Sequence, residues 1–258
     1  MKKFLVGGLA VAALAMPSAA AAQTPLPAPV VTTEGSISNN NAGTARTPTP
    51  VRFQFRAVNS AESQTTVSRI VLDMPTGVRL DGTRLAVCAS AVLQRRGPSA
   101  CPRASRLGSG VAYASLVNPA APAPDCAGTR GAAQGCITFD TTFFVGGKRL
   151  LSVWLVAPAL NIQRALQGRI TRSGRRLTLD IPRDLQSPTA GVFSALQQLS
   201  GSWFRTRRAG GRRYSFVSTT ACGSGNRWAF RTTFFYVPNP TPPPVTRQLA
   251  ESRQTCRR

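Results

Sequence analysis

Arginine dominates the residues of this sequence that could take part in chemistry. The stretch FRTRRAGGRRYSF, from Phe204 to Phe216, carries five arginines around a Gly-Gly pair. Guanidinium groups are planar forks of N–H donors that bind phosphate and carboxylate oxygens. A Gly-Gly pair between two strand-like segments is typical of a hairpin turn. The stretch is therefore either a solvated hairpin tip or a contact for something anionic.

Two other segments place arginines at or near predicted turns. One is TRSGRR around Ser173-Gly174, and the other is RWAFRTTFFYV from Arg227. The second has the basic and aromatic interleaving of an oligonucleotide or carbohydrate surface, but its aromatic residues alternate as a core face does, which favours the core. If the three segments meet, they form the candidate anion-binding site. Its residues would be Arg172, Arg175, Arg176, Arg205, Arg207, Arg208, Arg212, Arg213, Arg227 and Arg231.

The sequence contains no histidine, which restricts the catalytic chemistry it could perform. Without histidine it has neither a Ser-His-Asp nor a Cys-His nucleophile system, and it lacks the usual zinc ligand sets. We predict no catalytic residue, no metal site and no cofactor. The remaining enzymatic alternative is a pair of carboxylates that cleaves glycans. The acids considered for it are Asp73, Asp81, Asp125, Asp140, Asp180 and Asp184.

Asp140 illustrates how these acids are interpreted. It lies mid-strand in CITFDTTFF, on the same side as Thr138 and Thr142 and opposite Ile137 and Phe139. Isolated acids on strands commonly pair with charged neighbours across the sheet. We therefore interpret Asp140 as a solvent-facing acid paired with a nearby arginine.

The first residues and the overall charge indicate export and an anionic partner. Residues 1–22 have two lysines, an apolar run and Ala20-Ala21-Ala22, which is typical of a secretory signal cleaved after Ala22. The formal charge of the whole chain is +23. Without Lys2 and Lys3, 30 basic residues still face 9 acidic ones, a charge of +21. Such a chain attracts polyanions over a screening length of about 10 Å at 0.1 M salt, and outside a cell these are wall polymers, phospholipid head groups and nucleic acid.

An even number of cysteines in an exported chain indicates disulfides. There is no C-x-x-C pair that would favour a metal or redox site. Six cysteines allow many connectivities, but their grouping along the chain favours neighbours. The predicted pairs are Cys88 with Cys101, Cys126 with Cys136, and Cys222 with Cys256.

Hydrophobic patterning predicts a mainly β protein, an antiparallel sandwich or barrel-like domain with one short helix. VRFQFRAV alternates as a half-buried strand does, and Gly146-Gly147 and Ser173-Gly174 sit between strand-like segments as hairpin turns. The helix is expected after Ser187-Pro188, with Val192, Leu196 and Leu199 at helical spacing. The domain organisation is a signal peptide (1–22), a flexible Pro/Thr/Asn-rich leader (23–50), the β domain (51–237), and a Pro-rich strap with a basic tail tied back by a disulfide (238–258).

The segment VCASAVLQRRGPSACPRASRLGSGVA, from Val87 to Ala112, resembles an element of uncharacterised secreted proteins of high-GC actinobacteria. In that element a cysteine is followed by a short helical stretch, Cys-Pro and a Gly-x-Gly before a strand. The resemblance extends to about Cys256 and implies a disulfide-tied β domain exported to the cell surface or medium. It supports the pairing of Cys88 with Cys101 and carries no activity.

These observations favour a secreted, cell-envelope-associated binding or structural module that is not an enzyme. Its arginine-rich hairpin tips would contact an anionic cell-wall polymer or another polyanion. The alternative is a secreted carboxylate-dependent glycan hydrolase, which requires two acids brought together in a cleft.

Overall fold

A computed structural model describes residues 28–60, 65–117, 124–127, 135–237 and 245–257. The predicted signal peptide (1–22) and the proline-rich part of the predicted strap (238–244) lie outside the described residues. The described part of the chain is mostly β, with 58% of its residues in strands and 13% helical. The predicted fold class is confirmed, in its barrel-like form.

Eleven strands form one large sheet, and the remaining strands form two small ones. In chain order the strands are β1 (Val31–Ile37), β2 (Thr49–Pro50), β3 (Phe53–Asn59), β4 (Thr66–Asp73), β5 (Val78–Leu80), β6 (Arg106–Val117), β7 (Cys136–Gly147), β8 (Leu150–Ala157), β9 (Ile162–Thr171), β10 (Arg176–Asp180), β11 (Phe193–Trp203), β12 (Thr206–Ala209), β13 (Arg212–Ser215), β14 (Val217–Thr219), β15 (Arg227–Val237) and β16 (Arg247–Thr255). The helices are α1 (Ser90–Arg96) and α2 (Arg183–Gln186), with short 3-10 turns η2 (Pro98–Ala100), η3 (Arg103–Ser105), η4 (Pro158–Leu160), η5 (Arg172–Gly174) and η6 (Ser224–Asn226).

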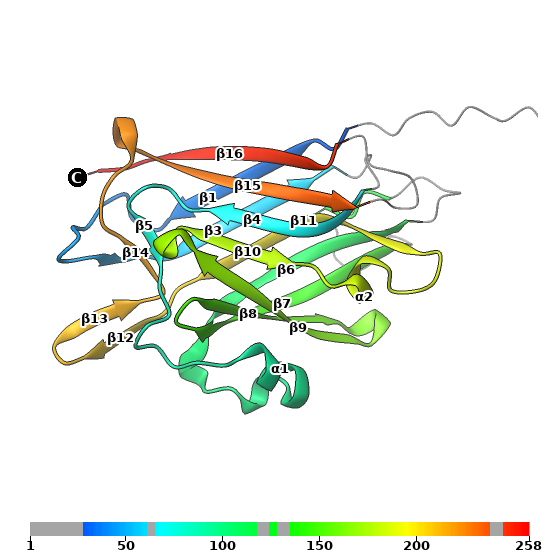
Figure 1. The fold of residues 1–258 in the computed structure, drawn as a ribbon, viewed down its shortest axis with the longest axis horizontal. Helices are drawn as coiled ribbons and strands as arrows, with labels where there is room; N and C mark the ends of the chain where they lie inside the picture. The colour runs from blue at the N-terminus through cyan, green and yellow to red at the C-terminus, as the bar shows by residue number, and fades with distance from the viewer. Residues whose placement is uncertain (1–27, 61–64, 118–123, 128–134, 238–244, 258) are drawn as a thin grey trace, which may run out of the picture.

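The large sheet is antiparallel between neighbours and almost closes on itself (Figure 1). Its strand order is β1-β3-β11-β6-β7-β8-β9-β10-β4-β15-β16. Strand β3 shows why these sequences form it, because Phe53, Phe55 and Ala57 are buried and Gln54 and Arg56 are exposed. Alternation with a period of two places one face inside the barrel and the other in water.

Aromatic side chains fill one end of the barrel interior. Trp203 lies at its centre, with ring centroids 5.0 to 6.1 Å from those of Phe53, Phe55, Phe143 and Phe216. Aromatic rings at such separations contribute about 0.5–1.5 kcal/mol per pair beyond their buried area. The small sheet β2-β14-β5 lies at one end of the barrel and α2 lies towards the other (Figure 1).

Helix α1 packs on the outside of the barrel rather than in it. Its Leu93 is buried against Phe144 and Trp154, with Cys88 beside them. The helix lies between Cys88 and Cys101, where the resemblance implied a short helical stretch. This second apolar cluster is separate from the barrel core.

The barrel closes between β1 and β16, and side chains make that closure. Ser252 Oγ accepts a hydrogen bond from Gly35 N at 2.9 Å. Gln254 Oε1 accepts from Ile37 N at 2.7 Å, and its Nε2 donates to Ile37 O at 2.8 Å and Asn40 Oδ1 at 2.7 Å. The seam runs parallel, since Asn41 and Arg257 form a parallel bridge beyond it. At this point the side-chain amide of Gln254 in β16, and not a backbone group, bonds to the backbone of β1.

Two predicted domain boundaries are wrong, because both chain ends add strands to the barrel. Part of the predicted leader (23–50) is β1, and part of the predicted tail (238–258) is β16. Neither segment has an apolar face that would reveal a strand. In β1, a Cβ at Gly35 would overlap the ring of Phe230, and the inward Thr33 bonds Thr232 at 2.7 Å between hydroxyl oxygens. Small and polar residues thus occupy inward positions at the seam.

The predicted helix after Ser187-Pro188 is also wrong, since this segment forms β11. The register of β11 against β6 shifts between Leu196 and Gln198, which is a β-bulge at Gln197. A bulge adds one residue, so Leu196 and Leu199 face inward at a spacing of three. That spacing imitates a helical period. The short helix α2 lies upstream of it, at Arg183–Gln186.

The predicted disulfides are confirmed. Cys88 pairs with Cys101, Cys126 with Cys136, and Cys222 with Cys256, with Cα atoms 5.4 to 5.6 Å apart. The predicted turn at Ser173-Gly174 is also confirmed, since it lies between β9 and β10. The predicted hairpin of β7 and β8 is present, but its turn is Lys148-Arg149, and Gly146-Gly147 form the end of β7.

The role of the seam can be tested with Gln254→Ala. Loss of three partly buried hydrogen bonds should lower the free energy of unfolding by about 2 kcal/mol, because Ile37 and Asn40 lose their partners. Gln248→Ala on the same strand is the matched control and should change it by less than about 0.5 kcal/mol. Urea unfolding measures both, and equal effects of the two substitutions would contradict a side-chain seam.

Candidate anion-binding groove

A groove of about 710 Å³ runs over the outer face of β10, β4, β15 and β16. Its walls include η5, which follows β9, and the turn that precedes β15. Six arginines and two acids line it, which leaves a formal charge of +4. These charged residues are Arg172, Arg175, Arg176, Arg227, Arg231, Arg253, Asp73 and Glu251.

The floor of the groove carries a row of alternating charges across four strands. In the register, Arg176 of β10 lies opposite Asp73 of β4, which lies opposite Arg231 of β15, which lies opposite Glu251 of β16. Arg176 donates to Asp73 through Nε and Nη2, each at 2.7 Å. Opposite charges across strands contribute roughly 0.2–1 kcal/mol per pair. The row therefore fixes these side chains in place.

Glu251 holds the far side of the row. Its carboxylate accepts from Arg231 Nε at 2.6 Å and from Arg253 Nε at 2.7 Å. Both hydrogen bonds lower the pKa of Glu251, and the one from Arg231 has the larger effect. Glu251 therefore carries its negative charge at neutral pH and neutralises part of the surrounding arginine charge. The hydrogen bond to Asp73 raises the pKa of Arg176, because it stabilises the charged guanidinium.

Three arginines of the groove have no ion-pair partner among the described residues. They are Arg172 and Arg175 at η5, and Arg227 at the start of β15. All three are exposed. Their donors are therefore available to an anion that enters the groove.

The turn that carries Arg172 adopts an unfavourable backbone. Arg172, Ser173 and Gly174 have φ angles of 49°, 53° and 90°. Residues with a Cβ lose about 1 kcal/mol or more in this left-handed region. Strain of this kind at residues with side chains is typical of sites where the side chain has a use.

The structure brings together five of the ten predicted anion-binding arginines. Arg172, Arg175, Arg176, Arg227 and Arg231 line the groove. Arg253 joins them, although it was not predicted, because the tail was not expected to be a strand. Only its two-residue spacing from Glu251, in the same alternating segment RQLAESRQT, could have indicated it.

The stretch from Phe204 to Phe216 forms a separate hairpin, β12–β13, and does not line the groove. Gly210 and Gly211 form its tip with φ angles of 55° and 72°, as the Gly-Gly pair predicts. Of the five predicted arginines here, Arg205 is half-buried, and Arg207 donates to the carbonyl of Arg84 at 3.1 Å. The others are exposed, namely Arg208, Arg212 and Arg213.

The interpretation of β15 as a core strand is confirmed. Trp228, Phe230, Phe234 and Tyr236 are buried on its inner face. The hydroxyl of Tyr236 donates to Asn59 Oδ1 at 3.0 Å, and burial raises its pKa. These four rings of β15 are therefore not a stacking surface for a ligand.

The acids considered for glycan hydrolysis are not paired with each other. Asp73 and Asp180 lie on neighbouring strands but four positions apart in the register, about 13 Å along the strand. Asp180 accepts hydrogen bonds from Arg69 and Arg169. Asp140 is exposed on β7, three strands from β10, or roughly 14 Å across the sheet.

The expected pairing of Asp140 with an arginine is wrong for the described residues. Asp140 shares its face with Thr138 and Thr142, as predicted, but forms no ion pair among the described residues. Asp81 and Asp125 accept backbone hydrogen bonds from Thr83 and Ala127. Asp184 pairs with Arg164.

Comparisons with protein families, curated proteins and solved structures found no match to this chain. The described helices include none that is long and apolar enough to cross a membrane.

The strained turn gives a prediction that separates stability from binding. Arg172→Gly should raise the free energy of unfolding by about 1 kcal/mol, because glycine adopts a positive φ without strain. The same change should weaken anion binding, because one free guanidinium is lost. Arg175→Gly is the control: its φ is −105°, so the variant should lose stability as well as charge.

Thermal or urea unfolding measures the two stabilities. A loss of stability in Arg172→Gly as large as that in Arg175→Gly would contradict a strained, functional Arg172.

Proposed function

We propose that this protein is a secreted, cell-envelope-associated module that binds anionic polymers in the arginine groove. It acts by binding and not by catalysis. The observation that carries the proposal is the set of three unpaired arginines, Arg172, Arg175 and Arg227, beside a row of ion pairs that holds the remaining groove arginines in place.

The charge arrangement favours a ligand that carries repeated negative groups. Three free guanidiniums on two sides of the groove match several anionic groups better than they match a single anionic group. Each charge-assisted hydrogen bond to phosphate or carboxylate is strong and directional. The large positive charge that remains without Lys2 and Lys3, +21 from 30 basic and 9 acidic residues, increases the rate of encounter with a polyanion and makes it depend on salt.

The proposed compartment rests on two observations. Three disulfides are typical of proteins that fold in an oxidising or extracellular environment. The first 22 residues have the sequence pattern of a cleaved secretory signal. Anionic wall polymers are the polyanions that a secreted protein meets at a cell surface, which makes them the proposed partner.

Groove binding predicts a specific loss in the triple variant Arg172→Ala, Arg175→Ala, Arg227→Ala. Its affinity for isolated, protein-free cell walls should fall at least about tenfold at low salt, since each screened contact contributes about 0.5 kcal/mol. Wild-type binding should weaken steadily as salt rises. Co-sedimentation across a salt series measures both quantities.

Two control variants make the test specific. The triple variant Arg96→Ala, Arg103→Ala, Arg106→Ala removes the same charge from exposed positions outside the groove and should bind within about twofold of wild type. The hairpin variant Arg207→Ala, Arg208→Ala, Arg212→Ala, Arg213→Ala should also retain most binding. If the hairpin variant alone loses binding, the site is the β12–β13 tip and the groove proposal is wrong.

A further inference from the structure

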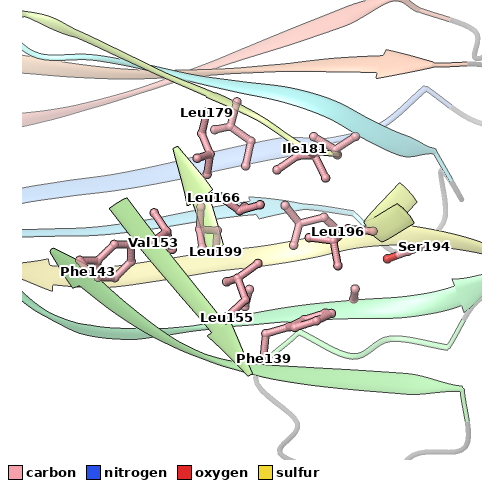
Figure 2. A pocket seen from close by; sticks show the side chains of 15 residues that line it. Phe139, Phe143, Val153, Leu155, Leu166, Leu179, Ile181, Ser194, Leu196 and Leu199 are labelled. Carbon is pink, nitrogen blue, oxygen red and sulfur yellow. The ribbon is translucent and has the colours of Figure 1, made fainter. Parts of the chain in front are cut away.

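The barrel interior is filled unequally along its length. The rings around Trp203 fill the part near the small sheet. The part towards α2 is lined mainly by aliphatic side chains, together with Phe139 and Phe143, and contains a cavity of about 60 Å³. Figure 2 shows these side chains converging from several strands on the cavity.

The cavity follows from the size of the barrel and the residues on its wall. Interior width grows with strand number, and about eight strands already give an interior that side chains just fill or that holds one small ligand. Eleven strands need larger side chains, yet β6 contributes only Ala112 and Ala114 here, and β11 contributes Ser194 beside its two leucines. Ser194 is the one polar side chain among the described residues that line the cavity.

The cavity reaches the surface beside α2. Ile181, Leu185 and Leu196 line it and are only half-buried, whereas Leu166 and Leu199 deeper inside are 3% and 6% exposed. Helix α2 has four residues, so it is a single turn with little stability of its own. A small apolar molecule therefore has a short route past these three side chains.

A second, smaller space lies deeper in the barrel. It measures about 10 Å³ and shares Ile70, Phe143, Val153 and other lining residues with the larger cavity. Trp203 also lines it, and the Nε1 of Trp203 is buried without a hydrogen-bond partner. An unpaired buried donor is unfavourable, and an acceptor atom placed beside it would remove that cost.

We propose that the barrel interior binds a small aliphatic compound with one hydrogen-bond acceptor, such as a ketone, alcohol or ester. Its chain lies in the larger cavity and its oxygen accepts from Trp203 Nε1. The lining supports this class because apolar cavities exclude water yet take up apolar molecules of matching size. This site lies inside the barrel and is independent of the groove on its outer face.

The probe for the test is 2-butanone, whose size matches a cavity of about 60 Å³, with 2-heptanone as the compound that has the same oxygen but a chain too long for it. In ¹⁵N-labelled protein, 2-butanone should shift the indole N–H resonance of Trp203 in a saturable way and raise the melting temperature. 2-Heptanone at the same concentration should do neither. The resonance is assigned by its absence in Trp203→Phe.

Variants locate the binding. Ala114→Leu fills the cavity and should weaken 2-butanone binding at least tenfold, and Ala112→Val is the smaller replacement to use if Ala114→Leu does not fold. Leu93→Ala alters the separate apolar cluster under α1 and should leave the affinity unchanged. An unchanged Trp203 resonance at millimolar 2-butanone would show that the cavity is only a packing defect. Equal binding by the wild type and both filling variants would also overturn the proposal.

Discussion

Closure of the barrel by its two end strands is the constraint on which the other features depend. The first and last strands, β1 and β16, meet in a parallel seam held mainly by Ser252 and Gln254. The disulfide between Cys222 and Cys256 ties the end of β16 to the segment before β15. If β16 separated, the interior would lose one wall. The groove would also lose Glu251 and Arg253, so seam, cavity and groove form one cooperative unit.

The scarce acids serve mainly to order arginines. Of the described acids, Glu34, Asp73, Asp180, Asp184 and Glu251 each pair with at least one arginine on the barrel surface. Exposed pairs of this kind contribute little to stability on their own. Their effect is to fix some guanidiniums and leave a surplus free. In the groove the arginines without an acidic partner among the described residues are Arg172, Arg175 and Arg227. Negative groups of a ligand could pair with them as Asp73 and Glu251 pair with the arginines of the row.

The sequence predicted the parts of the structure that have strong local signals. Alternating residues gave the core face of β15, paired glycines gave the β12–β13 turn, and cysteine grouping gave all three disulfides. It failed where long-range contacts replace local pattern. The strands β1 and β16 bury small and polar groups against each other, and the bulge at Gln197 disguises β11 as a helix. Arg253 was missed for the same reason, since its place in the groove depends on β16.

The most direct test of the anion site follows individual arginines in the wild-type protein. In ¹⁵N-labelled protein titrated with inorganic polyphosphate, the side-chain Nε–H resonances of Arg172, Arg175 and Arg227 should shift together and saturate at the lowest concentrations. The resonances of Arg208, Arg212 and Arg213 in the hairpin should respond later and without saturation. Saturable shifts confined to the hairpin, or uniform weak shifts of every exposed arginine, would contradict a specific groove.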